Sequence, residues 1–396
     1  MTWNDALNLL LRWAHLIAGI AWIGSSFYFI WLDSHLEAPQ AGVDDVEGHL
    51  WMVHSGGFYQ VERKRIGPGR MPSTLHWFKW EAAFTWITGI LLLAVVYYLT
   101  GGIYLLDSSS HLTPLTASLV GLGFIALAWL VYDGLWQSPL ASGAPGVATA
   151  ISLALVAGAT FGFSRLLSGR AAFIHVGAML GTIMVANVWM RILPAQQKMI
   201  DATSEGRTPD FTLSDRAKRR SVHNSYMTFP VLFIMLSNHF PALYGAPQNA
   251  LVLVLLMVAG ASARHVMIGK GPSRSWAGGA VALGLAGAFL LARPAAGMKV
   301  PAASAAAGPT PSFAEVQAIV QARCVACHSK TPRDATFGVA PAGVSFDDPA
   351  EIRRLAPRIY VRAVVTKTMP LANKTGATEA ERATLGRWIE HGAPAH

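Results

Sequence analysis

Residues Leu9–Leu32 read LLLRWAHLIAGIAWIGSSFYFIWL and carry a single charged side chain, Arg12. A helix that crosses a bilayer needs roughly 20 consecutive, mostly apolar residues. The N-terminus before this run lacks a basic segment, and no small-residue cleavage site follows the run. The run therefore predicts a retained membrane-spanning helix and not a cleaved signal peptide.

The rest of the chain has the composition of a membrane protein. Of its 396 residues 53% are hydrophobic and only 13% are charged, about half the usual charged fraction of a soluble domain. Eight apolar stretches are long enough, or nearly so, to span a bilayer, and they predict an all-α polytopic bundle over residues 1–293. They are Leu9–Leu32, Trp77–Leu99, Leu115–Tyr132, Val147–Leu166, Ala172–Leu193, Tyr226–Leu243, Ala250–Met267 and Trp276–Leu291.

The charges of the loops predict an orientation. Basic residues concentrate in the first long loop and in the loops after the fifth and seventh stretches, and the positive-inside rule places such loops in the cytoplasm. Both termini then lie outside. Arg165 and Arg170 go against this pattern, because they follow the fourth stretch on the outer side. The net charge of +9 fits anionic lipid headgroups, and no basic stripe interleaved with aromatics indicates nucleic acid.

The composition changes near the C-terminus. Residues 294–311 are rich in Ala, Pro and Gly, which is typical of a linker, and residues 312–396 read as a small soluble domain. Ser312 with Glu315, and Thr378 with Glu381, have the spacing of capping boxes and predict two helix starts.

The two cysteines of the chain lie in one motif, Cys324-Val-Ala-Cys327-His328. This C-x-x-C-H spacing is the attachment signature of a c-type haem. Two thiols add to the porphyrin vinyl groups, and the adjacent His328 ligates the iron. Met369, in TMPLAN (368–373), is the best candidate for the sixth ligand, because a thioether raises the reduction potential. A thioredoxin-like pair or half of a zinc site are the alternatives, but the βαβ pattern and further ligands that these need are absent from the sequence.

Several histidines lie in or near the apolar stretches, where ionisable side chains are costly and each is a functional hypothesis. We expect His15, His175 and His239 toward the outer side, and His76, His223 and His265 toward the cytoplasmic side. His54 is a further polar candidate in the first loop. Facing histidines can hold a haem b or contribute to a substrate site, although carbonyl-bonded or helix-end histidines are the plainer interpretation.

The longer motifs resemble one family. RWAHLIAGIAWIG (12–24), LWMVHSGGFYQ (50–60), HVGAMLGTIMVAN (175–187) and HNSYMTFPVLFIMLSNH (223–239) are similar to the bacterial membrane-bound, cytochrome c-linked urate oxidases. The resemblance covers nearly the whole chain, with eight membrane helices followed by a class I cytochrome c. It implies that urate and water give 5-hydroxyisourate, two protons and two electrons.

The resemblance also implies electron transfer to the respiratory chain, through a cytochrome c or a terminal oxidase. Covalent haem attachment occurs outside the cytoplasmic membrane, so we expect a bacterial inner-membrane protein with its cytochrome domain in the periplasm, in agreement with the loop charges. Because a single haem c accepts one electron and urate loses two, a haem b in the membrane is a further expectation, with ligands among His15, His175 and His239. A quinol-to-cytochrome c conduit and a transporter-like bundle fused to a cytochrome remain as alternatives, and the residues that bind urate stay unassigned.

Overall fold

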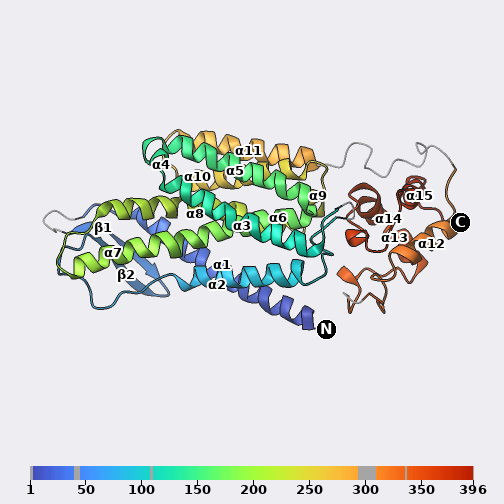
Figure 1. The fold of residues 1–396 in the computed structure, drawn as a ribbon, viewed down its shortest axis with the longest axis horizontal. Helices are drawn as coiled ribbons and strands as arrows, with labels where there is room; N and C mark the ends of the chain where they lie inside the picture. The colour runs from blue at the N-terminus through green and yellow to red at the C-terminus, as the bar shows by residue number, and fades with distance from the viewer. Residues whose placement is uncertain (1–2, 40–44, 108–109, 293–308, 335–336, 396) are drawn as a thin grey trace.

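The computed structural model describes residues 3–39, 45–107, 110–292, 309–334 and 337–395. Long helices run side by side in one bundle, and a smaller helical domain follows at one end (Figure 1). The bundle helices are α1 (Trp3–His35), α2 (Trp80–Leu93), α3 (Pro114–Gln137), α5 (Pro145–Leu166), α6 (Gly169–Asn187), α7 (Leu193–Ser204), α8 (Phe211–Ser237), α10 (Asn249–Ile268) and α11 (Ser273–Ala292), with the short α4 (Pro139–Gly143) and α9 (Pro241–Tyr244) between them.

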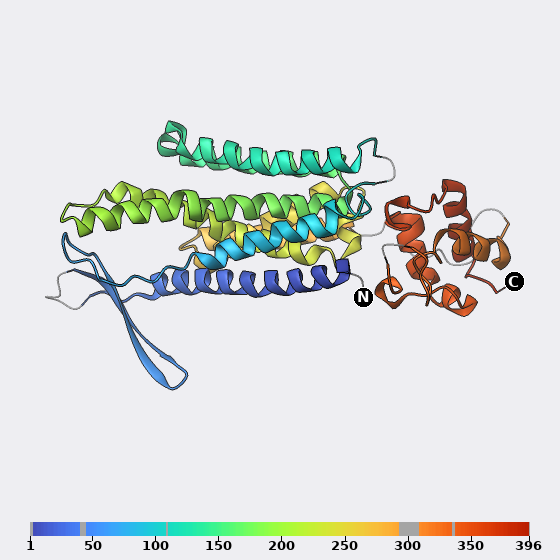
Figure 2. The same ribbon diagram turned by 60° about the horizontal axis from the view of Figure 1, so that its bottom comes forward.

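Seven helices of the described chain are long and apolar enough to cross a membrane, which makes the protein a multi-pass membrane protein by length and composition. They coincide with seven of the eight expected stretches. The exception is the stretch Tyr226–Leu243. This stretch lies largely in α8, which ends at Ser237. The first half of α8 carries four basic residues, Arg216, Lys218, Arg219 and Arg220. The helix nevertheless runs the length of the bundle and packs against α6 and α10 (Figure 2).

The first long loop contains the main departure from the all-α prediction. Strand β1 (Val46–His54) pairs antiparallel with β2 (Gly57–Lys64). Ser55 and Gly56, both with positive φ, form a tight two-residue turn of the kind that matches strand twist. This hairpin projects from the end of the bundle farthest from the C-terminal domain, which we call the hairpin end (Figure 2).

Helix α6 forms the centre of the bundle, where it packs against α3, α5 and α8. Most of its side chains are buried. Small residues allow these close approaches, as in other membrane bundles. At Gly177, for example, a Cβ atom would lie only 2.6 Å from Cγ2 of Ile234 on α8.

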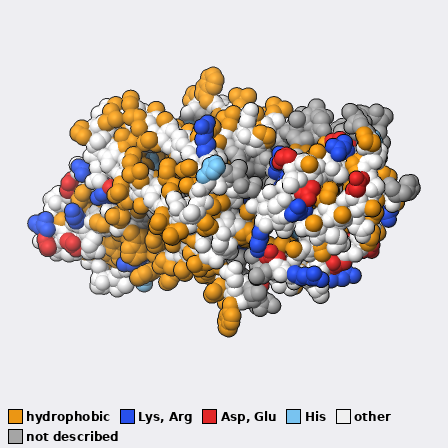
Figure 3. All heavy atoms as spheres, turned by 45° about the vertical axis from the view of Figure 1, so that its right-hand side comes forward, with side chains coloured by type: hydrophobic (Ala, Val, Ile, Leu, Met, Phe, Trp, Pro, Cys, Tyr) orange, Lys and Arg blue, Asp and Glu red, His pale blue; other side chains and the backbone are white. Residues whose placement is uncertain are grey.

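The surface of the bundle fits a lipid environment. Hydrophobic side chains cover most of its middle, whereas charged side chains gather at the hairpin end and over the C-terminal domain (Figure 3). The basic loops named above lie together at the hairpin end, and the N-terminus lies at the opposite end beside the C-terminal domain (Figure 1). The structure thus separates the two sets of loops as the charge pattern predicts.

The C-terminal domain is built from α12 (Phe313–Arg323), α13 (Pro349–Arg354), α14 (Ala356–Ile359) and α15 (Glu379–Glu390). Both expected capping boxes are present, at Ser312 with Glu315 and at Thr378 with Glu381. Fully buried Trp388 lies in a core that includes Val316, Val320 and Ile352. Most of the expected linker, 294–311, lies outside the described residues.

Candidate functional site

The cysteine motif and Met369 line one cavity in the C-terminal domain. Helix α12 ends at Arg323, and the chain turns at once, with the His328 amide donating to the Cys324 carbonyl over 2.9 Å. This turn brings both thiols and the imidazole to the same wall. Apolar side chains, among them Phe346, Leu355 and Ile359, complete the lining.

His328 has the orientation of a metal ligand. Its Nδ1 lies 3.1 Å from the carbonyl oxygen of Val344. Because a carbonyl can only accept, Nδ1 carries the proton and Nε2 keeps its lone pair. Burial lowers the pKa of His328, which favours the neutral imidazole.

Met369 is held through its backbone. Its amide donates to the Arg362 carbonyl over 2.9 Å, and its carbonyl accepts from Nη1 of Arg382 over 2.7 Å. Two thiols, an imidazole and a thioether in one apolar cavity are the donor set that a covalently attached haem requires, so these residues fit the group.

The thiols do not have the properties of a thioredoxin-like pair. Burial raises the pKa of Cys324 to about 12 and also raises the pKa of Cys327. Redox-active cysteine pairs depend instead on a lowered thiol pKa. Within the described ranges, no group of three or more His, Cys, Asp or Glu side chains could hold a metal ion.

A second cavity, of about 440 Å³, is bordered by α1, α2, α6 and α8, and we call it the membrane cavity. His15 and His239 both line it, so the structure brings two of the three expected outer histidines together. Most of the wall is apolar, and it includes Gly19, Gly89 and Gly181.

The remaining candidate histidines lie elsewhere. His175 is fully buried, with Nδ1 2.8 Å from the Ala171 carbonyl and Nε2 2.9 Å from the Tyr98 hydroxyl. His265 likewise has hydrogen-bond partners on both ring nitrogens, Tyr226 and Ser273. His76 is exposed just before α2, and His54 is exposed at the tip of the hairpin.

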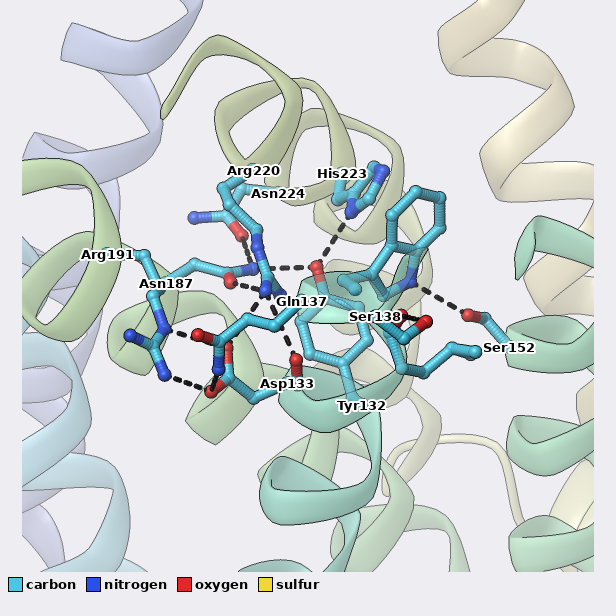
Figure 4. Close-up of polar contacts among 12 residues, drawn as sticks. Tyr132, Asp133, Gln137, Ser138, Ser152, Asn187, Arg191, Arg220, His223 and Asn224 are labelled. Atoms are coloured by element: carbon cyan, nitrogen blue, oxygen red, sulfur yellow. Dashed lines mark hydrogen bonds and ion pairs between the residues drawn. The ribbon is translucent and has the colours of Figure 1, made fainter. Parts of the chain in front are cut away.

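His223 belongs to a buried polar network of side chains from several helices (Figure 4). Its Nδ1 lies 2.7 Å from the Tyr132 hydroxyl. Asp133 accepts from Arg220 over 2.9 Å and from Arg191 over 2.8 Å. One carboxylate offsets one of the two arginine charges, so the cluster keeps a net positive charge. The network connects α3, the helical turn Val188–Ile192 that follows α6, and α8.

One hydrogen bond links the wall of the cysteine cavity to the wall of the membrane cavity, and we call this place the junction. Tyr104, in the loop before α3, and Arg170, in the first turn of α6, line the cysteine cavity. The Arg170 guanidinium lies 4.7 Å from the Tyr104 ring centroid, and its Nε donates to Oδ1 of Asn238 over 3.2 Å. Asn238 in turn lines the membrane cavity. No sequence motif indicates this role, because Arg170 stands out only as a basic residue on the unexpected side.

Taken together, the fold defines a multi-pass helical membrane protein with a cofactor-type cavity in an attached domain. The family model described as "Urate oxidase N-terminal" matches residues 1–292, and the chain belongs to this urate oxidase-related family. The match covers the whole membrane domain and ends before the C-terminal domain. Searches among curated proteins and among solved structures gave no match.

Proposed function

We propose that the protein is a membrane-bound urate hydroxylase that passes electrons through a covalent haem c to the respiratory chain. The reaction, urate plus water to 5-hydroxyisourate, two protons and two electrons, is balanced without oxygen. Family membership supports urate as the substrate and oxidoreduction as the chemistry. The C-terminal domain supplies the route by which the electrons leave.

One observation supports the part of this proposal that family membership does not cover, the transfer of electrons to the C-terminal domain. Tyr104 and Arg170 of the urate oxidase-related domain form part of the wall around Cys324, Cys327 and His328. In the proposed holoprotein the two thiols hold the haem, His328 and Met369 ligate its iron, and the bound haem supplies a one-electron carrier. Electrons from the membrane domain thus enter the cytochrome across the junction of the two domains.

The proposal includes an orientation. Covalent haem attachment takes place outside the cytoplasmic membrane, so the C-terminal domain lies in the periplasm of a bacterium. The basic loops at the hairpin end then face the cytoplasm, in line with the positive-inside rule. The acceptor is a soluble cytochrome c or a terminal oxidase.

The test is an anaerobic visible spectrum of the purified, oxidised protein before and after the addition of urate. We expect the reduced c-type α-band with urate and not with xanthine. A Cys324→Ser/Cys327→Ser variant, which cannot attach the haem, should show no such band. Reduction by a quinol with no response to urate would replace the proposal with a quinol-to-cytochrome conduit.

A further inference from the structure

We infer that the membrane cavity is a second haem site, in which His15 ligates the iron of a non-covalent haem b. The inference goes beyond the proposed function, since it concerns a cofactor in the bundle and can be tested without urate. Cofactor sites in helical bundles are commonly built from side chains of facing helices around such a cavity.

The first argument is the orientation of His15. Its Nδ1 lies 3.0 Å from the Thr85 carbonyl oxygen and 3.0 Å from the Thr88 hydroxyl. A carbonyl can only accept, so the proton is on Nδ1 and the lone pair is on Nε2 of a histidine that lines the cavity. His328 has the same arrangement, with its Nδ1 against the Val344 carbonyl oxygen. A backbone carbonyl that accepts from the other ring nitrogen is a common partner of a metal-ligating histidine.

His175 lacks this property. Nδ1 of His175 donates to Ala171, and its Nε2 accepts from the Tyr98 hydroxyl. Both ring nitrogens are therefore engaged within the protein. Of the two deeply placed histidines, His15 is the one that presents a lone pair to the cavity.

The second argument is the shape and polarity of the wall. The His15 ring packs against the backbone of Gly89, where a Cβ atom would lie 3.1 Å from Cε1 of the ring. Gly19, one turn after His15 on the same face of α1, and Gly181 on α6 also line the cavity, and a Cβ at either position would meet nothing within 4 Å. Glycines at these places leave a wide apolar space, which suits a large flat ring better than a small polar anion such as urate.

The third argument is the charge at the outer end of the cavity. Arg12 lies one turn before His15 on the same face of α1, and Asn238 and His239 line the same end. None of the described residues that line the cavity is acidic. A haem carries two carboxylates, and an arginine with amide and imidazole donors is the set of groups that binds them.

The position of the cavity gives the haem a role. Urate gives up two electrons and a haem c accepts one, so a second one-electron centre beside the junction allows both to leave the substrate. Asn238 connects this cavity, through Arg170, to the wall of the cysteine cavity. The b-type centre would thus lie next to the c-type one.

The test is the haem content of the full-length protein, purified in detergent from cells grown with a haem precursor. A pyridine haemochrome spectrum should show one b-type haem for each c-type haem. His15→Ala should lose at least 80% of the b-type signal and keep the c-type signal. The matched control is His35→Ala, because exposed His35 ends the same helix and does not line the cavity.

A second variant allows the same test if His15→Ala folds poorly. Gly19→Leu would place a side chain into open space and obstruct part of the cavity, so the variant should fold and lose the b-type haem. Gly123→Leu on α3 is its control, since a Cβ there also meets nothing within 4 Å and Gly123 does not line the cavity. A wild-type protein that holds only c-type haem, or a His15→Ala variant with full b-type content, overturns the inference. Neither result involves urate, so both are distinct from a failure of the proposed function.

Discussion

At the residue scale, we expect substitutions in the buried ion pairs of the bundle to lower the free energy of unfolding strongly. The side chains of Asp133 and Arg220 are 9% and 6% exposed. Removing one partner of a buried pair leaves the other charge uncompensated, which typically costs about 3–5 kcal/mol.

We therefore expect Asp133→Asn to lower the free energy of unfolding by about 3 kcal/mol or more. Thermal unfolding in detergent measures this change. Asp201→Asn is the control, because Asp201 is exposed and its side chain accepts a hydrogen bond from the side-chain amide of Gln197. Equal melting temperatures for the two variants would show that the network contributes no such stability.

Two glycines of α3 give a second prediction at this scale. A Cβ at Gly121 would lie 2.8 Å from Nε2 of buried His175, whereas a Cβ at Gly123 would meet nothing within 4 Å. Gly121→Ala should destabilise the bundle by about 1–3 kcal/mol, the usual cost of overpacking. Gly123→Ala should leave the melting temperature unchanged or raise it slightly, because alanine has the better helix propensity. A lower melting temperature for Gly123→Ala, together with an unchanged melting temperature for Gly121→Ala, would contradict the packing described for α3 and α6.

At the scale of elements, α15 depends on its first turn. The Thr378 amide donates to the Glu381 carboxylate over 2.7 Å, and Nε of Arg323 donates to it over 3.0 Å. These contacts, led by the Thr378 amide, lower the pKa of Glu381. A carboxyl group whose pKa is lowered by folding stabilises the fold above its unfolded pKa, and this contribution is lost as the pH falls through the folded value.

We expect Glu381→Gln to be less stable than the wild type at neutral pH. The difference should shrink as the pH falls below about 4.3, the ordinary pKa of a glutamate, because the wild type then loses its advantage. Denaturant unfolding at a series of pH values measures the difference. A constant difference across the acid range would rule out the ionised Glu381 as its source.

The cap itself gives a second prediction at this scale. The Thr378 hydroxyl accepts from the Glu381 amide over 3.2 Å. Thr378→Ala should cost about 1 kcal/mol, the typical value for a lost N-cap. Thr384→Ala, within the same helix and outside its cap, should cost less in the same unfolding experiment.

At the scale of the whole molecule, the two domains meet through few but specific groups. Besides Arg170 and Tyr104, the α9 turn approaches the Met369 loop. A Cβ at Gly245 would lie 3.1 Å from Cγ2 of Thr368. The junction therefore places the membrane domain against the loop that carries the expected sixth ligand.

On the proposed function, we expect Arg170→Ala to slow the reduction of the proposed haem c by urate at least tenfold while the haem content stays unchanged. The Arg170 guanidinium joins Tyr104 to Asn238, and its loss separates the two cavities. Anaerobic stopped-flow spectroscopy measures the rate. Arg165→Ala is the control, because exposed Arg165 lies in the last turn of α5 and does not line the cysteine cavity. Equal rates for the two variants would exclude Arg170 from the route.

Much of the fold follows from local composition. The length of the apolar stretches predicts seven of the spanning helices, because a bilayer sets a minimum length that does not depend on neighbours. The capping boxes predict the starts of α12 and α15 for the same local reason. The β1–β2 hairpin was missed, since a two-residue turn with strands in a charged loop gives a weak signal.

The sequence alone determined the membrane class of this protein, the separate C-terminal domain and the C-x-x-C-H motif, because each depends on residues that are close together in the chain. The tertiary structure decided which distant groups meet. It engaged both nitrogens of His175, left one lone pair of His15 for the membrane cavity, and placed Arg170 between two cavities. Such choices follow from the packing of helices that are far apart in sequence, and no spacing within one helix encodes them.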